Sequence, residues 1–233
     1  MEIADKVDNI VNLPLFFGLK DTDVKRIADQ FIISDVKKNK FLFEEGVGSH
    51  WIFFVLRGKI KVLAHSASGK DVIVKLSTDN DLLTDNGVIY NSDSEYNYSA
   101  QALEDSIVAK VSVTDFKNML NTFPVISLNL NSLLDKYLRD SYLVLRDMAL
   151  EKVERRIAIN ILKLAKRTGV KVKEGIKLQI KLSRQDIANL SGTTIETAIR
   201  VMSKLKKDGI ISEEKGSITI TQRHRLVSIA EEF

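Results

Sequence analysis

The residues best suited to chemistry on a partner molecule lie in one segment, residues 194–204. Glu196 and Arg200 stand four residues apart, which places a carboxylate and a guanidinium on the same side of a helix. In the major groove of DNA, a guanidinium can donate to both acceptors of guanine, and a carboxylate can accept from the amino group of cytosine. Isoleucines at positions 195 and 199 could pack on a thymine methyl group. The segment therefore suits contact with the edges of base pairs.

These side chains fall on the second of two short predicted helices. Ser183 is the expected N-cap of the first helix, with Asp186 three residues on, and this helix ends before Gly192. Thr193 with Glu196 forms the expected capping box of the second helix. The apolar residues that recur at helical spacing in the second helix are Ala198, Val201, Met202 and Leu205. Two helices joined by a short glycine-containing turn are the layout of a helix-turn-helix.

If those apolar positions face inward, the polar and basic side chains between them face outward and can enter a major groove. The residues expected to bind DNA are Arg184, Thr194, Ile195, Glu196, Ile199, Arg200, Ser203, Lys204 and Lys215. The alternative is an ordinary helical hairpin, in which the isoleucines belong to the core and the lysines form a solvated face. The segment Ile210–Thr221 contains two β-prone runs around a Lys-Gly turn, which favours a winged helix-turn-helix with Lys215 near the DNA backbone.

The charge of the chain is unevenly divided along its 233 residues. From Val153 onward there are 17 Lys and Arg residues against 9 Asp and Glu, whereas residues 1–152 carry 18 against 22. A basic C-terminal part joined to a mildly acidic N-terminal part agrees with an electrostatic footprint on DNA.

The sequence lacks the features of several other protein classes. It has no cysteine, which excludes disulfides, cysteine-ligated metal sites and thiol redox sensing. It has no apolar run of about 18 residues and no signal-peptide core, so we expect a cytoplasmic protein without a membrane partner. It also lacks the common phosphate-binding, dinucleotide-binding, zinc-protease and serine-hydrolase motifs, so we expect no enzyme and no catalytic residues. Since His50, His65 and His224 do not stand at ligand spacing, we expect no metal and no cofactor.

Residues from about Lys37 to Val113 are predicted to form a β-rich domain. Short alternating or apolar runs such as WIFFVL, KIKVLA and DVIVKL are separated by polar turns, which suggests a small barrel or jelly roll. The glycines expected at turns are Gly46, Gly58 and Gly69. A helix precedes this domain, with Asp21 or Thr22 as its expected cap.

A long helical pattern from roughly Pro124 to Leu150 follows the β-rich domain. Its apolar stripe consists of Leu130, Leu133, Leu134, Tyr137, Leu138, Val144, Leu145 and Met148. A stripe of this length would expose much apolar surface in a monomer, so we expect two copies to pair through parallel helices. The alternative is a core helix packed wholly on its own barrel. The expected fold is α+β: a β-roll sensor domain (1–120), a dimerisation helix and hinge (121–152), and a winged helix-turn-helix (153–233).

This order of elements resembles the CRP/FNR family of bacterial transcription regulators. The similar segments are PLFFGLKDTDVKRIA, FLFEEGVGSHWIFFVLRGKIKVL, SGKDVIVKL and LSRQDIANLSGTTIETAIRVMSKLKKDGII. The resemblance implies a homodimer on a palindromic site of double-stranded DNA, with Glu196 and Arg200 at the base-contacting positions and RNA polymerase as a further partner. Ile195 favours a TTGA-type half-site of the FNR branch, and Ile199 departs from the serine usual in that branch.

The resemblance bears on the effector mainly by exclusion. Cyclic-nucleotide-binding members hold their ligand with a Gly-Glu pair and an Arg-Ser-Ala segment, where this chain has Thr84-Asp85 and Tyr98-Ser99-Ala100. Without the arginine, a buried phosphate charge has no partner, so we do not expect cyclic AMP. The cysteine set of the oxygen-sensing FNR branch is absent as well.

The residues expected to line an effector pocket are Asp85, Tyr98, Ser99, Ser141 and Tyr142. They could bind a small organic effector, or they could fill the pocket so that the dimer is active without one. A second interpretation of the whole chain stays open beside the regulator. In it, a ligand-binding or structural β-roll protein uses its basic winged helix to contact protein or RNA.

Overall fold

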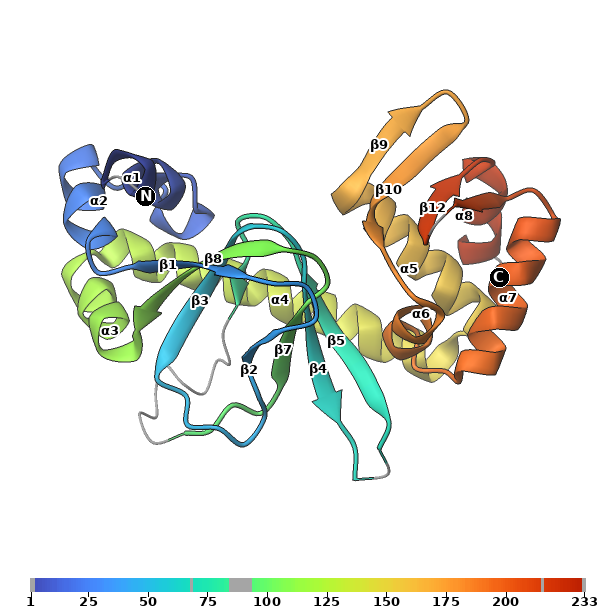
Figure 1. Cartoon of the computed structure of the whole chain (residues 1–233), viewed down its shortest axis with the longest axis horizontal. Coiled ribbons are helices and arrows are strands. Elements are labelled where there is room, and N and C mark those ends of the chain that lie inside the picture. The colour runs from blue at the N-terminus through green and yellow to red at the C-terminus, as the bar shows by residue number, and fades with distance from the viewer. Residues whose placement is uncertain (1–2, 68, 84–93, 215, 232–233) are drawn as a thin grey trace. The chain divides into compact units, whose positions relative to one another are not determined.

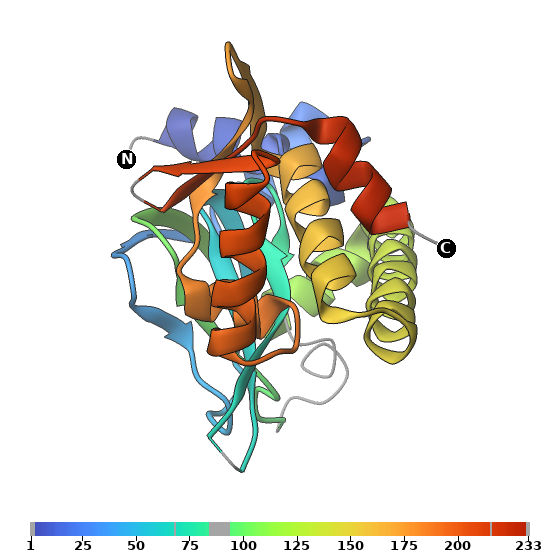
Figure 2. The same ribbon diagram turned by 90° about the vertical axis from the view of Figure 1, so that its right-hand side faces the viewer.

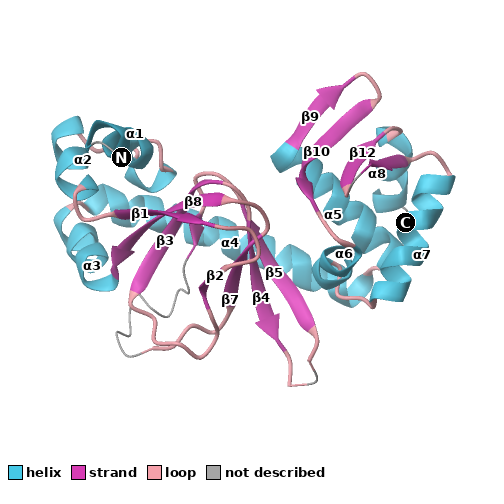
Figure 3. Cartoon of the chain, in the orientation of Figure 1, coloured by secondary structure: helices cyan, strands magenta, loops and turns pink. Residues whose placement is uncertain are grey.

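The computed structural model describes residues 3–67, 69–83, 94–214 and 216–231. The chain divides into two compact units, Met1–Arg139 and Asp140–Phe233, and the division falls inside the long helix α4 (Pro124–Leu150; Figure 1). The bounds of α4 are those predicted from the sequence. Both units contain helices and strands, which confirms the α+β class (Figure 3).

The first unit is built around two antiparallel sheets, each with four strands among the described residues. One sheet has the order β1-β8-β3-β6 and the other β2-β7-β4-β5, so strands distant in sequence lie side by side. The strands are β1 (Ile32–Val36), β2 (Phe41–Phe43), β3 (Trp51–Arg57), β4 (Ile60–His65), β5 (Asp71–Ser77), β6 (Leu82–Leu83), β7 (Ser99–Ala102) and β8 (Ser106–Ser112). This arrangement confirms the predicted β-roll.

The first strand starts earlier than the predicted β-rich domain, which was expected to begin at about Lys37. β1 lies at the edge of its sheet and none of its residues is fully buried. A strand of this kind lacks the alternation of buried and exposed residues by which a strand is found in sequence.

The turn between β3 and β4 requires glycine. Gly58 has a φ of 116°, and a Cβ atom at this position would lie 2.2 Å from Oγ of Ser106. The backbones of two strands can approach here only because there is no side chain. Gly46 and Gly69 also have positive φ, as the sequence predicted for turn residues.

Helices α1 (Ile3–Val11), η1 (Pro14–Phe16) and α2 (Asp21–Ala28) precede the roll. The ring centroids of Phe16, Phe31 and Phe54 lie 5.7 to 5.8 Å apart, so the entry helices and β3 share one aromatic core. The predicted cap of α2 at Asp21 or Thr22 is wrong: the N-cap is Lys20, whose side chain makes no capping bond. Asp21 instead occupies the first turn, where a carboxylate is favoured by the helix dipole.

Helices α3 (Val113–Thr122) and α4 close the first unit. Ile126 and Leu130 of α4 are buried in the roll's core, and the side chain of Asn129 donates to the carbonyl oxygens of Leu15 and Phe17 at 3.0 and 2.8 Å. The second half of α4 is different, because most of its apolar side chains are exposed in the single chain.

The second unit contains the predicted winged helix-turn-helix. Its elements are the end of α4, α5 (Val153–Thr168), β9 (Gly169–Val172), β10 (Gly175–Lys181), α6 (Arg184–Leu190), α7 (Ile195–Lys207), β11 (Ile211–Glu214), β12 (Ser217–Ile220) and α8 (Arg223–Glu231). The described strands form one sheet in the order β11-β12-β10-β9. Figure 2 shows α7 along its length, with α5 beside it and the β9–β10 hairpin extending past the helix ends.

Strands β9 and β10 were not predicted, although part of the pattern was present. Leu178 and Ile180 of β10 are buried, whereas Lys177, Gln179 and Lys181 between them are exposed. All of β9 is exposed, so it carries no such alternation. The extra hairpin widens the wing and adds lysines to its outer face.

Candidate nucleic-acid interface

The first helix of the motif begins as the sequence predicts. The hydroxyl of Ser183 accepts from the backbone N–H of Asp186 at 3.1 Å, and the Asp186 carboxylate accepts from the backbone N–H of Ser183 at 3.0 Å. This reciprocal capping box satisfies two donors that the start of a helix leaves without partners. It fixes where α6 begins.

The turn between α6 and α7 is in contact with both α4 and α5. Gly192 has a φ of 58°, and a Cβ there would lie 2.8 Å from Sδ of Met148. The guanidinium of Arg156, on α5, donates to the carbonyl oxygens of Ser191 at 3.0 Å and Gly192 at 3.3 Å. The end of α4 and the first turns of α5 therefore support the turn that sets the position of α7.

The predicted capping box of Thr193 with Glu196 is wrong by one residue. The N-cap of α7 is Thr194, whose hydroxyl accepts from the backbone N–H of Thr197 at 3.3 Å. Thr193 belongs to the turn, because its N–H donates to the carbonyl oxygen of Ala188 at 3.0 Å. The residue left in the extended conformation before the helix is therefore Thr194.

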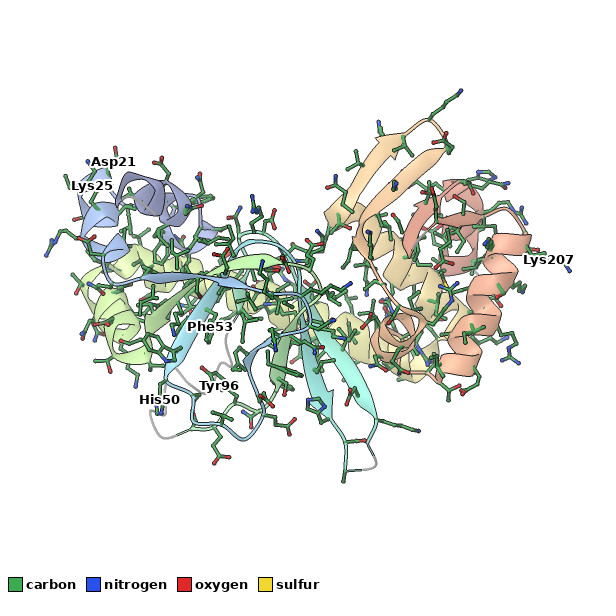
Figure 4. All side chains as sticks on the ribbon, viewed as in Figure 1. Asp21, Lys25, His50, Phe53, Tyr96 and Lys207 are labelled. Carbon is green, nitrogen blue, oxygen red and sulfur yellow. The ribbon has the colours of Figure 1, made fainter. Side chains whose placement is uncertain are left out.

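Helix α7 separates its apolar and polar residues as predicted. The apolar positions Ala198, Val201, Met202 and Leu205 are all buried. The predicted DNA-binding residues that the structure exposes are Thr194, Glu196, Ile199, Arg200, Ser203 and Lys204. Ile195 is half-buried at the start of the helix. Lys207, labelled in Figure 4, extends away from the end of the helix.

Glu196 and Arg200 differ in their surroundings. Hydrogen bonds from its own backbone N–H and from the Thr194 hydroxyl lower the pKa of the Glu196 carboxyl, so it is ionised at neutral pH. Within the described part of the chain, Arg200 forms no salt bridge and its guanidinium is exposed. A charged acceptor and a donor fork thus stand one helical turn apart on an open surface.

The other basic residues predicted to bind DNA have carboxylate partners. Both terminal nitrogens of Arg184 donate to Glu213 on β11, at 2.7 and 2.5 Å. Nζ of Lys204 donates to Glu154 on α5 at 2.9 Å. Lys215 lies outside the described residues, between β11 and β12 in the sequence. These two pairs could not be predicted from the sequence, because each joins residues that are far apart along the chain.

Two lysines that were not predicted to bind DNA lie on β10, which pairs with β12 of the wing. In the pairing of β10 with β12, Lys177 stands opposite Thr219 and Lys181 opposite Ser217, and both lysines are exposed. The alternation of apolar residues around them was the signal that could have found them.

The predicted effector residues that the structure describes are divided between the two units. Tyr98 is exposed, whereas Ser99 is buried and its hydroxyl accepts from the backbone N–H of Glu45 at 3.0 Å. Ser99 is also bonded to Nε2 of His65 at 3.0 Å, and Nδ1 of His65 is bonded to Asp71 at 2.7 Å. The Ser99 hydroxyl is therefore already engaged by the roll itself.

The remaining effector residues lie elsewhere. Ser141 and Tyr142 are exposed on α4 in the second unit, and Asp85 lies outside the described residues. His65 is the last residue of β4. In the part of the chain that the structure describes, no cluster of three or more His, Asp or Glu side chains could hold a metal ion. No described helix is both long and apolar enough to cross a membrane.

Comparison with known protein families gives two matches, one in each unit. The Crp-like helix-turn-helix domain matches residues 155–229, and the cyclic nucleotide-binding domain matches residues 33–123. The chain belongs to the CRP/FNR family of transcription regulators. The helix-turn-helix of this CRP/FNR regulator is accordingly a DNA-binding domain.

Relatives of this regulator match along most of their length. The cyclic AMP receptor protein of Thermus thermophilus is 24% identical over 217 residues, which cover 93% of this chain and 96% of that protein. The transcriptional activator protein anr of Pseudomonas aeruginosa is 26% identical over 221 residues, covering 94% and 88%. The structure of FixK2 from Bradyrhizobium japonicum matches with a TM-score of 0.76 at 18% identity, covering 87% of this chain and 98% of that one, and so shares the fold.

Proposed function

We propose that this regulator binds a two-fold symmetric DNA site as a homodimer, with Glu196 and Arg200 making the principal base contacts. The observation that carries the proposal is the exposed side of α7, where an ionised carboxylate and an exposed arginine stand four residues apart. Thr194 and Ser203 can bond phosphates or base edges, and Ile195 and Ile199 can pack on thymine methyl groups.

The exposed half of α4 supports the homodimer. Leu138, Tyr142 and Leu145 are 52, 62 and 66% exposed in the single chain. With Ala149 they follow one another at spacings of four, three and four residues, which is the heptad pattern of a two-stranded coiled coil. Pairing through this stripe would bury it and relate two copies of α7 by a two-fold axis.

A symmetric dimer predicts the form of the DNA site. Its two recognition helices would enter successive major grooves on one face of the duplex, about one helical turn apart. Ile195 next to Glu196 favours TTGA-type half-sites, as the resemblance to the FNR branch implies. The positively charged wing, with Lys177, Lys181 and Lys215, would contact the flanking backbone.

The test is selection of binding sites from random duplex DNA with the purified full-length protein at one fixed salt concentration. We expect a palindrome of TTGA-like half-sites with centres about ten base pairs apart. Salt-sensitive binding without any enriched sequence would overturn the proposal, because the domain would then recognise only the DNA backbone.

The finer assignments of the regulator belong to the same proposal. We assign residues 1–120 to sensing, 121–152 to dimerisation and the hinge, and 153–233 to DNA binding, in a cytoplasmic protein that works with RNA polymerase and has no enzymatic activity. A small effector other than cyclic AMP would bind at Asp85, Tyr98, Ser99, Ser141 and Tyr142. In the alternative, these residues fill the pocket and the dimer is active without an effector. An unchanged melting temperature of the protein in excess cyclic AMP is the expected result; a concentration-dependent increase would overturn the exclusion of that nucleotide.

A further inference from the structure

Lys204 lies on the exposed side of α7, four residues after Arg200, and its charge is already engaged. Its Nζ is 2.9 and 3.3 Å from the two carboxylate oxygens of Glu154. Glu154 belongs to the first turn of α5, so this ion pair joins the recognition helix to the helix behind it. In the free protein, the positive charge of Lys204 is thus partly neutralised by Glu154.

The ion pair can be exchanged for a different partner. The Lys204 and Glu154 side chains are 59 and 35% exposed, and ion pairs at such positions are weak because water screens them. A DNA phosphate is an equally good acceptor for an ammonium group. Lys204 would therefore have to leave Glu154 when α7 meets the DNA backbone.

The second ion pair of this surface is built differently. Arg184 and Glu213 are joined by two hydrogen bonds, and their side chains are only 27 and 14% exposed. This pair joins α6 to β11 and so holds the wing against the helix-turn-helix. The Lys204–Glu154 pair joins two helices that already pack together, so it contributes little to holding them in place.

We propose that Glu154 competes with DNA phosphate for Lys204 and thereby lowers the affinity of this regulator for DNA of any sequence. The inference rests on the proposed function, since it needs α7 to face DNA. Because phosphate contacts carry no sequence information, the competition weakens binding to specific and random duplexes by the same factor. It limits the time that the protein spends on the many non-specific sites of a genome.

The test compares the full-length wild-type protein with Glu154→Gln on the selected site and on a scrambled duplex of equal length. We expect Glu154→Gln to bind both duplexes about two- to fivefold more tightly, which is the range that a weak surface pair allows. We also expect its affinity to fall more steeply with salt, by about one further released ion, because the ammonium group of Lys204 is then no longer paired with Glu154.

A double-mutant cycle shows whether Glu154 acts through Lys204. In a Lys204→Gln background, the Glu154→Gln substitution should no longer change the affinity. Glu231→Gln is the matched control, because Glu231 is an exposed glutamate of the same unit, at the end of α8 and outside the wing, and its loss changes the net charge equally. Melting curves of all variants would show whether the fold is retained.

Each outcome decides the inference. Equal affinities of the wild type and Glu154→Gln would overturn it, as would the same gain in Glu231→Gln or an undiminished gain in the Lys204→Gln background. A wild-type protein that binds duplex DNA without an enriched site would overturn the proposed function alone, since the competition for phosphate could still be measured. A wild-type protein that binds no DNA would overturn both.

Discussion

Helices α4 and α7 both expose apolar side chains, but the neighbours of those side chains differ. Ile199 of α7 is 44% exposed, and it lies beside Arg200 and one turn from Glu196. On the second half of α4, exposed apolar residues follow one another along the helix, and Leu138 and Leu145 are separated by two turns of a continuous stripe.

This contrast indicates that the two helices suit different kinds of binding partner. An isolated isoleucine among charged groups is common on protein surfaces and suits a mixed partner such as the edge of a base pair. A continuous apolar stripe is costly in water and needs an apolar partner of similar length. In the proposed function, α7 is therefore the surface for nucleic acid and α4 the surface for a second copy of the chain, and symmetric recognition of DNA needs both.

The largest expected effect comes from breaking the stripe on α4. Leu145→Glu would bury a charge in the dimer seam, so we expect a monomer at micromolar concentration. Binding to the full palindromic site should weaken about 100-fold or more, because two half-sites are then no longer bound by one connected molecule. Light scattering after size-exclusion chromatography gives the mass, and a fluorescence titration gives the affinity.

Leu150→Glu is the control for this variant. Leu150 is also exposed on α4, but it lies outside the heptad positions defined by Leu138, Tyr142 and Leu145. We expect Leu150→Glu to remain dimeric with nearly unchanged DNA affinity. If the Leu145→Glu protein is dimeric and binds the palindrome with wild-type affinity, α4 is excluded as the pairing surface.

The two helices were also the elements most accessible to sequence analysis. The bounds of α4 were predicted correctly, since Pro124 suits the first turn of a helix and an apolar periodicity continues to Leu150. The start of α7 was misplaced by one residue because Thr193 and Thr194 are equally good caps. Only the bond from Thr193 to Ala188, which depends on the turn, distinguishes them.

The contacts of Ser99 show what sequence analysis could not predict. Ser99 was predicted to line a pocket, but its hydroxyl is bonded to His65 and to the backbone of Glu45, which lie 34 and 54 residues away along the chain. No local period encodes such a contact, because the sheet order β2-β7-β4-β5 brings these segments together. The buried and exposed sides of one helix could therefore be predicted, whereas contacts between strands that are distant in sequence could not.

A smaller effect is expected from removing one base contact on α7. Arg200→Gln retains a long polar side chain but loses the guanidinium fork, so we expect a loss of about 1–3 kcal/mol that is confined to one position of each half-site. Affinities for a set of duplexes with single base changes would measure this selectivity. Lys207→Gln removes the same charge from an exposed position at the end of α7. It should weaken binding to all duplexes alike, and equal behaviour of the two variants would exclude Arg200 as a base-reading residue.

The smallest expected effect concerns the isolated isoleucine itself. Ile199→Ala should leave the free energy of unfolding within about 0.5 kcal/mol of the wild type, because the side chain is exposed. It should cost less than about 1 kcal/mol of binding, and only on duplexes that place a thymine methyl against it. Val201→Ala, on the buried side of the same helix, should do the opposite, lowering the stability to chemical denaturant while leaving the base preference intact. If Ile199→Ala instead weakened the dimer, the isoleucine would belong with the leucines of α4, and α7 would be a protein-binding surface as well.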